Sequence, residues 1–320
     1  MAKNGNDTTG NGGVGNPFLT IGKAVGLVGA SQTQQVVINV LPGQYTESLT
    51  LSNKNIRIVG QQSQDTTTNT RIVGNHTIAT SNATRSNNTV EFANIQLNVA
   101  SGAMLTCSTT GSGAGYLYFN NVYFGDNGAA STGTSFITCG SLCDITMKMY
   151  TCRLSTSIQS FTAPLIKLDS PASLQVINCA FDTQNAQPFI QTNGTSSLYM
   201  ANTQLFNTQP TTVFQGLLDL SSNPGVVVSN NIGQTSLLAS TLTATGTPAI
   251  NVVANGQNVV LVSNVFGVRA GASNATYCVE SNLGSTATVI YYANNNNLAN
   301  TAGSLVSGGG ITTTALHNVT

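Results

Sequence analysis

The chain is poor in the side chains that carry most protein chemistry. It has no tryptophan, 2 histidines and 6 cysteines in 320 residues, and charged residues make up 6% of it, against roughly 25% in an ordinary soluble domain. Ten basic residues balance ten acidic ones, and no basic run is present. This argues against a nucleic-acid binder, which needs clustered Lys and Arg to displace counterions.

The shortage of histidine and cysteine also limits catalysis and metal binding. With His76 and His317 as the imidazoles of the chain, a histidine-based triad or zinc site has almost nothing to be built from. The cysteines form neither a CxxC pair nor the density of a disulfide scaffold. We therefore expect no cofactor and no metal.

Long apolar runs are absent too. No window approaches the roughly 18 uncharged apolar residues of a membrane span, and the start, Met-Ala-Lys-Asn-Gly-Asn-Asp, lacks the apolar core of a signal peptide. The sequence thus predicts neither membrane insertion nor Sec-dependent export. At 40% hydrophobic residues, arranged in patterns, the chain is too apolar to be disordered.

A short pattern recurs along the chain: an apolar residue, any residue, a second apolar residue, any residue, then Asn. Clear copies are Val-Glu-Phe-Ala-Asn-Ile-Gln-Leu ending at Leu97 and Leu-Tyr-Phe-Asn-Asn-Val-Tyr-Phe ending at Phe124. The keyed positions, 24 to 34 residues apart, are Asn94, Asn121, Thr151, Asn178, Asn202, Asn230, Asn264 and Asn294. A second apolar strand pattern lies between successive copies, at 104–107, 136–139, 164–168, 188–192, 216–220, 248–252 and 277–280. Each unit therefore holds at least two short strands and no helix.

Units of this kind cannot bury their apolar faces alone, but they can when wound into stacked coils. Each strand then pairs in parallel with its equivalent one coil later. Asn suits a fixed turn position because it tolerates the left-handed bend and its amide can bond to the next Asn. The sequence predicts an all-β, single-stranded parallel β-helix of about nine coils. We divide it into an N-terminal arm and cap helix (1–30, the helix within Phe18–Val28), the β-helix (31–300) and a C-terminal strand or tail (301–320).

Four segments near the N-terminus follow one another at regular spacing. They are Phe-Leu-Thr-Ile-Gly-Lys-Ala-Val (18–25), Val-Leu-Pro-Gly-Gln-Tyr-Thr-Glu (40–47), Ile-Arg-Ile-Val-Gly (56–60) and Thr-Arg-Ile-Val-Gly-Asn (70–75). In order and spacing they resemble the opening of pectin methylesterases, in the pectin-lyase-like superfamily. The resemblance covers roughly a quarter of the chain closely and implies a right-handed β-helix with a short N-terminal capping helix. These are scaffold motifs, so they say almost nothing about a reaction.

The catalytic signatures of that superfamily are missing. Pectin methylesterases carry two aspartates on neighbouring coils, the second in a Gly-x-x-Asp-Phe-x-Phe-Gly segment. The segment 149–160 resembles the approach to the first aspartate, but Ser or Thr stands in its place and no Asp-Phe-x-Phe-Gly follows. The Asp/Glu set of pectate lyases and the Asn-x-Asp and Asp-Asp motifs of polygalacturonases are also absent. We expect no enzyme, and assign no catalytic, cofactor-binding or metal-binding residue.

The acids that remain have ordinary explanations. Asp126 and Asp182 follow their keyed Asn by five and four residues, which suggests a similar face and a general acid/base pair. They belong to coils two apart, about 10 Å from each other, so surface turn acids are the more common interpretation. We expect Asp169 and Asp219 to face outward beside the second strand pattern. An ion pair between Arg153 and Asp182 fits the coil spacing.

The histidine and the cysteines are expected to be structural. His76 lies in Gly-Asn-His-Thr, which predicts an exposed turn residue and not a catalytic one. Cys152 and Cys179 each follow a keyed position, while Cys107 and Cys139 end equivalent second strands. We predict two interior stacks of free thiols that behave as small apolar residues. Unpaired thiols agree with assembly in a reducing compartment.

Three functions fit these features, and the first is favoured. It is a non-enzymatic structural or attachment component of a virus particle, a capsid-surface or spike protein. The second is a tailspike-like polysaccharide hydrolase or lyase, whose groove Tyr116, Tyr118, Tyr123 and Tyr150 could line, although strand alternation predicts that some of them are in the core. The third is a cell-surface adhesin or carbohydrate-binding module.

The favoured function implies partners and a location. The expected partners are other virion proteins or further copies of the chain, with a trimer among the assemblies the resemblance allows, and host-surface glycans. No nucleic acid and no membrane insertion is expected. The expected location is the virion surface, after assembly in the host cytoplasm.

Overall fold

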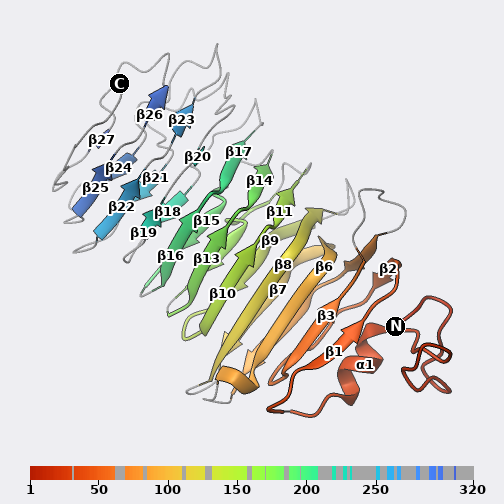
Figure 1. Cartoon of the computed structure of the whole chain (residues 1–320). Coiled ribbons are helices and arrows are strands. Elements are labelled where there is room, and N and C mark those ends of the chain that lie inside the picture. Colours follow the sequence, from red (N-terminus) through yellow and green to blue (C-terminus); the bar gives the residue numbers. More distant parts are fainter. Residues whose placement is uncertain are drawn as a thin grey trace.

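In the computed structural model the chain winds into an elongated stack of coils, from the helix α1 near the N-terminus to β27 near the C-terminus (Figure 1). The described residues are 1–30, 32–61, 69–81, 85–109, 113–126, 132–156, 161–169, 171–183, 187–194, 196–207 and, beyond these, the strands alone.

Two large parallel sheets form the walls of the stack. One has 16 strands and the other has 9, and a pair of short strands forms a third. The 16-stranded sheet contains β1 (Val36–Asn39), β2 (Gly43–Thr46), β3 (Ile56–Val59), β4 (Thr70–Val73), β6 (Thr89–Val99), β8 (Ala114–Asp126), β10 (Asp144–Tyr150), β11 (Arg153–Ser155), β13 (Ser173–Ile177), β14 (Ala180–Thr183), β16 (Ser197–Ala201), β17 (Gln204–Asn207), β19 (Val226–Val228), β20 (Asn231–Ile232), β22 (Asn258–Val262) and β25 (Thr288–Tyr292).

The 9-stranded sheet takes one strand from each coil. Its strands are β5 (His76–Thr80), β7 (Ser101–Thr109), β9 (Thr132–Cys139), β12 (Ile166–Leu168), β15 (Ile190–Thr192), β18 (Leu218–Leu220), β21 (Ile250–Val252), β24 (Val279–Ser281) and β27 (Val306–Ser307). The third sheet pairs β23 (Val265–Gly267) with β26 (Asn295–Asn297), and a 3-10 turn, η1, covers Arg85–Asn87. The second strand pattern of the sequence corresponds to strands of this 9-stranded sheet, namely β7, β9, β12, β15, β18, β21 and β24. The prediction of a parallel β-helix is therefore confirmed.

The keyed asparagines lie where the larger sheet bends. Asn94, Asn121, Asn178 and Asn202, and Thr151 in the equivalent place, have φ between 49° and 56°. This left-handed region suits Asn far better than most residues. The amide of Asn121 donates to Asn94 Oδ1 at 2.8 Å, so the predicted turn ladder is confirmed for these coils. The keyed positions 230, 264 and 294 lie outside the described residues.

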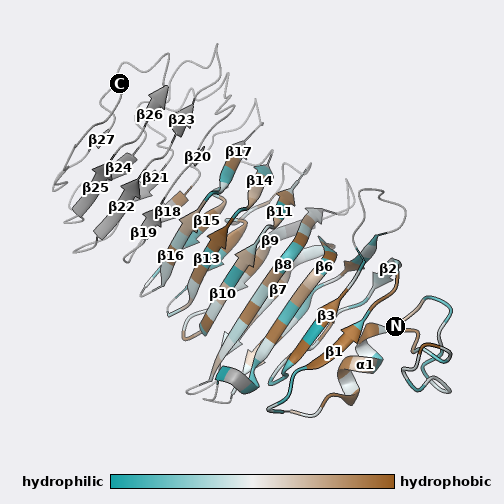
Figure 2. Ribbon diagram, in the orientation of Figure 1, coloured by the Kyte–Doolittle hydropathy of each residue, from teal (hydrophilic) through white to brown (hydrophobic). Residues whose placement is uncertain are grey.

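The core runs through the centre of the stack as columns of apolar side chains. One inward column reads Ile58, Phe92, Phe119, Met149, Val176 and Met200 from β3 to β16. The rings of Phe92 and Phe119 stack with centroids 5.8 Å apart and planes 8° from parallel. Figure 2 shows hydrophobic and hydrophilic residues alternating along these strands, as expected when one side faces a core.

The helix α1 (Ile21–Leu27) closes the N-terminal end, with Ile21 and Val25 buried. It begins three residues later than the start expected at Phe18. The reason is local: Thr20 is the N-cap and accepts from Lys23 N, while the Glu47 carboxylate accepts from Ile21 N and Gly22 N. These oxygens satisfy N–H groups that the first helical turn leaves without partners.

Candidate ligand-binding face

The outward side of β3, β6, β8, β10, β13 and β16 carries tyrosines and charged side chains close together. We call this surface the tyrosine face. Its central column reads Arg57, Glu91, Tyr118, Lys148, Gln175 and Tyr199. A second column beside it reads Thr89, Tyr116, Thr146, Ser173 and Ser197. In a chain with 6% charged residues, such a cluster marks a candidate functional surface.

Two tyrosines form a stacked aromatic pair in the middle of this face, here called the platform. Tyr116 and Tyr118 are separated by one residue on β8, so both point outward. Their rings have centroids 5.8 Å apart and planes 12° from parallel. The pKa of Tyr118 is raised, first by burial and then by the neighbouring acidic groups, including Tyr116. The Tyr118 phenol therefore remains a neutral hydrogen-bonding group at ordinary pH.

A cation lies over each ring of the platform. The Arg85 guanidinium lies 5.9 Å from the Tyr116 ring centroid, and the Lys148 ammonium lies 5.9 Å from the Tyr118 centroid. A cation at this distance is attracted to the negative face of the ring.

The other charges of the face are compensated. Arg57 Nε lies 3.1 Å from Glu91 Oε1. Arg85 pairs with Asp144 and also donates to Thr146 Oγ1 at 2.8 Å. Within the described part of the chain, Lys148 is the cation of this face that no carboxylate pairs with. The face therefore presents one uncompensated positive charge beside two aromatic rings.

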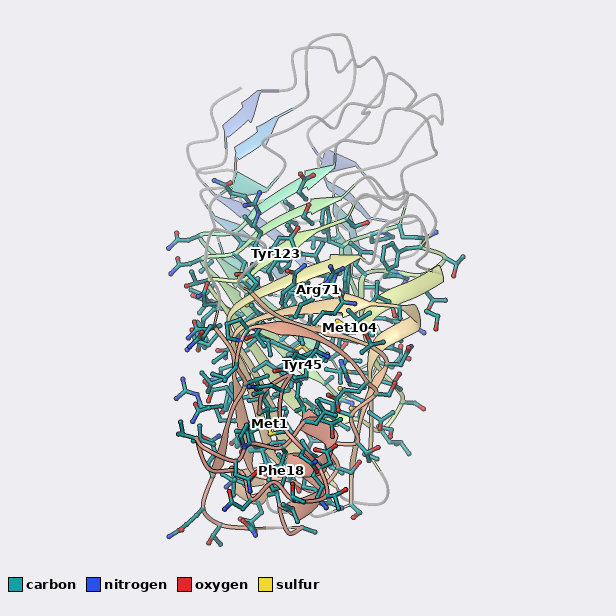
Figure 3. The ribbon with its side chains drawn as sticks, turned by 90° about the vertical axis from the view of Figure 1, so that its right-hand side faces the viewer. Met1, Phe18, Tyr45, Arg71, Met104 and Tyr123 are labelled. Atoms are coloured by element: carbon teal, nitrogen blue, oxygen red, sulfur yellow. The ribbon has the colours of Figure 1, made fainter. Side chains whose placement is uncertain are left out.

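The four tyrosines singled out in the sequence all lie outside the core. Tyr116, Tyr118, Tyr123 and Tyr150 are each partly exposed, so the expectation that some of them are buried was wrong. All four occupy outward positions of alternating strands, and Phe119 and Phe124 fill the inward positions of β8 instead. Tyr123 lies on β8 beyond the bend at Asn121, in one outward column with Arg71 and Gln96 (Figure 3).

The two acids considered as a catalytic pair are described unequally. Asp182 shares a column with Ser155 and Gly125. Asp126 is the next residue along β8, and its backbone pairs with Val99. The side chain of Asp126 lies outside the described residues, so the prediction that the two carboxylates share one face stays a prediction.

Asp169 has a structural role, and the side chain of Asp219 lies outside the described residues. The Asp169 carboxylate lies 3.3 Å from Lys167 Nζ and accepts from Asn193 Nδ2 at 2.8 Å. Asp219 stands in the column of Lys167 and Gln191 along the 9-stranded sheet. Arg153 and Asp182 lie on adjacent coils, but Arg153 pairs with Ala180 and so stands two residues from Asp182 along the strand.

His76 is buried, contrary to the expectation of an exposed turn residue. It opens β5, and its side chain is 1% exposed. Its Nδ1 accepts from Leu49 N at 3.1 Å, and burial lowers its pKa to about 4. The imidazole is therefore neutral and carries its proton on Nε2. The alternation through Ile78 and Thr80 was the signal that places His76 on the inward side.

The cysteines form the two predicted interior stacks. Cys107 pairs with Cys139 across β7 and β9, and Cys179 Sγ accepts from Cys152 N at 3.3 Å. Cys143 joins the first stack. All five are buried and free. Burial raises the pKa of the Cys152 thiol, so it behaves as a small apolar group and not as a nucleophile.

An apolar cleft of about 400 Å³ lies at the N-terminal end, between the arm, α1 and β1. Met1, Phe18, Val28, Val36 and Ile38 are among its lining residues. Several large apolar side chains nearby are exposed, namely Val14, Leu27, Val37 and Leu41. The cleft offers hydrophobic contact and little chemistry.

The described residues offer neither a cluster of metal ligands nor a membrane-spanning helix. No group of three or more His, Cys, Asp or Glu side chains is placed to hold a metal ion. None of the helices described has the length and hydropathy that a bilayer crossing requires.

Comparison with known proteins identifies a similar fold but no protein family. No protein-family model matches the chain, and no curated protein matches it. A solved structure described as "Geobacillus virus E2 - ORF18" is similar, with a TM-score of 0.52 and 14% sequence identity over 92% of this chain and 56% of that one. The chain thus spans little more than half the length of this neighbour. At such low identity the likeness shows the fold, a β-solenoid.

Proposed function

We propose that the chain is a non-enzymatic structural or attachment component of a virus particle, at the capsid surface or in a spike. The observation that carries this proposal is the unbroken parallel stack from β1 to β27. Each coil is hydrogen-bonded to the next, and the coils whose side chains the structure describes pack on a shared core, which makes an elongated body that resists bending. A body of this kind suits a protein that bears load or projects a surface.

The use of the carboxylates supports a structural role. Glu47 caps α1, and Asp7 accepts from Leu19 N, Thr20 N and Thr20 Oγ1 beside it. Glu91, Asp144 and Asp169 each pair with a cation. Each of these five acids thus has a partner that explains its position without a reaction.

The comparisons and the composition support a viral setting. The solved structure that shares the fold is named for a virus, Geobacillus virus E2. An uncharged surface rich in Asn, Thr and Ser packs against neighbouring subunits through shape and hydrogen bonds. We propose other virion proteins or further copies of the chain as partners, and membership of the pectin-lyase-like superfamily on the resemblance within residues 18–75.

The test is to look for the protein in purified particles of the virus that encodes it. We expect mass spectrometry to find it at a fixed ratio to the major capsid protein, and labelled antibodies to reach it on intact particles. Its absence from particles would overturn the proposal. A second assay incubates the purified chain with host polysaccharides: release of reducing ends or unsaturated sugars would overturn the non-enzymatic role alone.

A further inference from the structure

We propose that the tyrosine face binds a glycan that carries carboxylates, with Tyr116 and Tyr118 as the stacking platform and Lys148 as the group that receives a carboxylate. The proposal rests on the attachment function above and names the class of partner for it.

The platform supplies aromatic surface for a sugar ring. The rings of Tyr116 and Tyr118 stack, with planes 12° from parallel and centroids 5.8 Å apart. A pyranose ring has a patch of C–H groups on one side that packs on such a surface. The phenol groups at the ring ends, and Thr146 and Ser173 in the next two strands, supply hydrogen-bonding partners for sugar hydroxyls.

The charge pattern selects an acidic sugar. Arg57 is occupied by Glu91, and Arg85 by Asp144. Lys148 stays within 5.9 Å of the Tyr118 ring centroid and has no carboxylate partner within the described residues. A sugar stacked on Tyr118 therefore brings a ring carboxylate next to an ammonium that is already positioned.

The repeat of the coils favours an extended ligand. Successive strands lie about 4.8 Å apart, so a chain of sugars laid along the axis meets a new outward row at each coil. Beyond Lys148 these rows present Gln175 and Tyr199. A flat surface binds a single sugar weakly, and several linked contacts raise the overall affinity. A nucleic acid does not fit, because one uncompensated cation displaces too few counterions.

The experiment measures binding of the purified full chain to defined oligosaccharides by isothermal titration calorimetry. The probes are hyaluronan oligomers for uronic acids, polysialic acid oligomers for sialic acids, and dextran as the neutral control. We expect binding to at least one acidic oligomer and none to dextran. Lys148→Gln and Tyr118→Leu should each weaken that binding tenfold or more.

Matched controls separate this site from general charge and from misfolding. Lys167→Gln removes a partly exposed lysine from the 9-stranded sheet and should leave binding unchanged. Circular dichroism should show all variants folded, since Tyr118 and Lys148 lie outside the core.

The outcomes distinguish the two proposals. Binding to the uronate or the sialate oligomer alone identifies the source of the carboxylate. Equal binding to dextran, equal loss with Lys167→Gln, or no binding to any acidic oligomer overturns the glycan site. None of these results bears on whether the protein is found in virus particles, which is measured separately.

Discussion

The two sides of the same strands follow different rules. Inward, the column from Ile58 to Met200 varies between Ile, Phe, Met and Val but stays apolar throughout. Outward and one residue away, the column from Arg57 to Tyr199 changes from cation to anion to aromatic ring and back to cation. The hydrogen-bonded ladder is the same for both columns.

The difference shows which constraint acts on each side. Burial fixes the polarity of the inward residues, because an unpaired polar group in the core costs stability. The outward residues are free of that constraint and need only be soluble. A cluster of charges and rings on the outside therefore carries information about function, whereas a cluster of phenylalanines inside carries information about packing.

The largest predicted effect on stability comes from truncating a side chain on the inward side. Phe119→Ala removes a fully buried ring that stacks on Phe92 and contacts Phe124, and should lower the free energy of unfolding by about 3–5 kcal/mol. Tyr118→Ala, on the outward side of the same strand, should cost about 1 kcal/mol or less. Urea unfolding measures both; equal losses would show that the two sides do not differ.

His76 is the titratable exception on the inward side. Its pKa falls from 6.5 to about 4 on folding, so the unfolded chain binds a proton more readily than the folded chain. The stabilisation from this group is complete above pH 6.5 and is lost as the pH falls toward 4. We expect a loss of about 3 kcal/mol over that range, measured as urea unfolding at a series of pH values.

A variant isolates the contribution of this imidazole. His76→Asn keeps an acceptor near the position of Nδ1 for Leu49 N but does not titrate. Its stability should change less between pH 6.5 and pH 4 than that of the parent chain. If both proteins lose the same stability, His76 is not the cause of the acid sensitivity.

The smallest effect concerns the exposed bend of the coil at Thr151, the position that Asn occupies in neighbouring coils. Thr151 has a φ of 53°, which is strained for a β-branched residue. Thr151→Asn should raise the free energy of unfolding by about 1 kcal/mol. The reverse change, Asn121→Thr, should lower it by about as much and also removes the bond to Asn94. Opposite shifts of the unfolding midpoint in urea are expected; shifts of the same sign would contradict the role of the turn.

Much of the fold could be predicted from the sequence because the same pattern of apolar residues and Asn recurs in successive coils. The keyed asparagines and the apolar strands between them gave the parallel stack, the turn conformation at Asn94 and Asn121, and the thiol pairs. The first coils were harder to predict, since they lack the keyed Asn. His76 was misplaced there for that reason, although β5 has the same alternation as later strands.

The candidate site was less predictable, because it depends on register. Spacing between repeats fixes a strand position only to within about one residue, and a shift of one residue reverses which side a strand residue faces. The tyrosines were visible in the sequence, and strict alternation from Phe119 would have placed Tyr116 and Tyr118 outside. What no spacing could show is that Arg57 and Arg85 are neutralised while Lys148 is left available.

The 9-stranded sheet has a consequence for how such a molecule can change its reach. Because each coil contributes one strand to this sheet, the rod grows or shrinks in whole steps of about 4.8 Å. Duplication of one coil would lengthen the rod by one such step. The residues of the other coils would keep equivalent pairing partners. A descendant protein could thus span a different gap without redesign of the surface it displays.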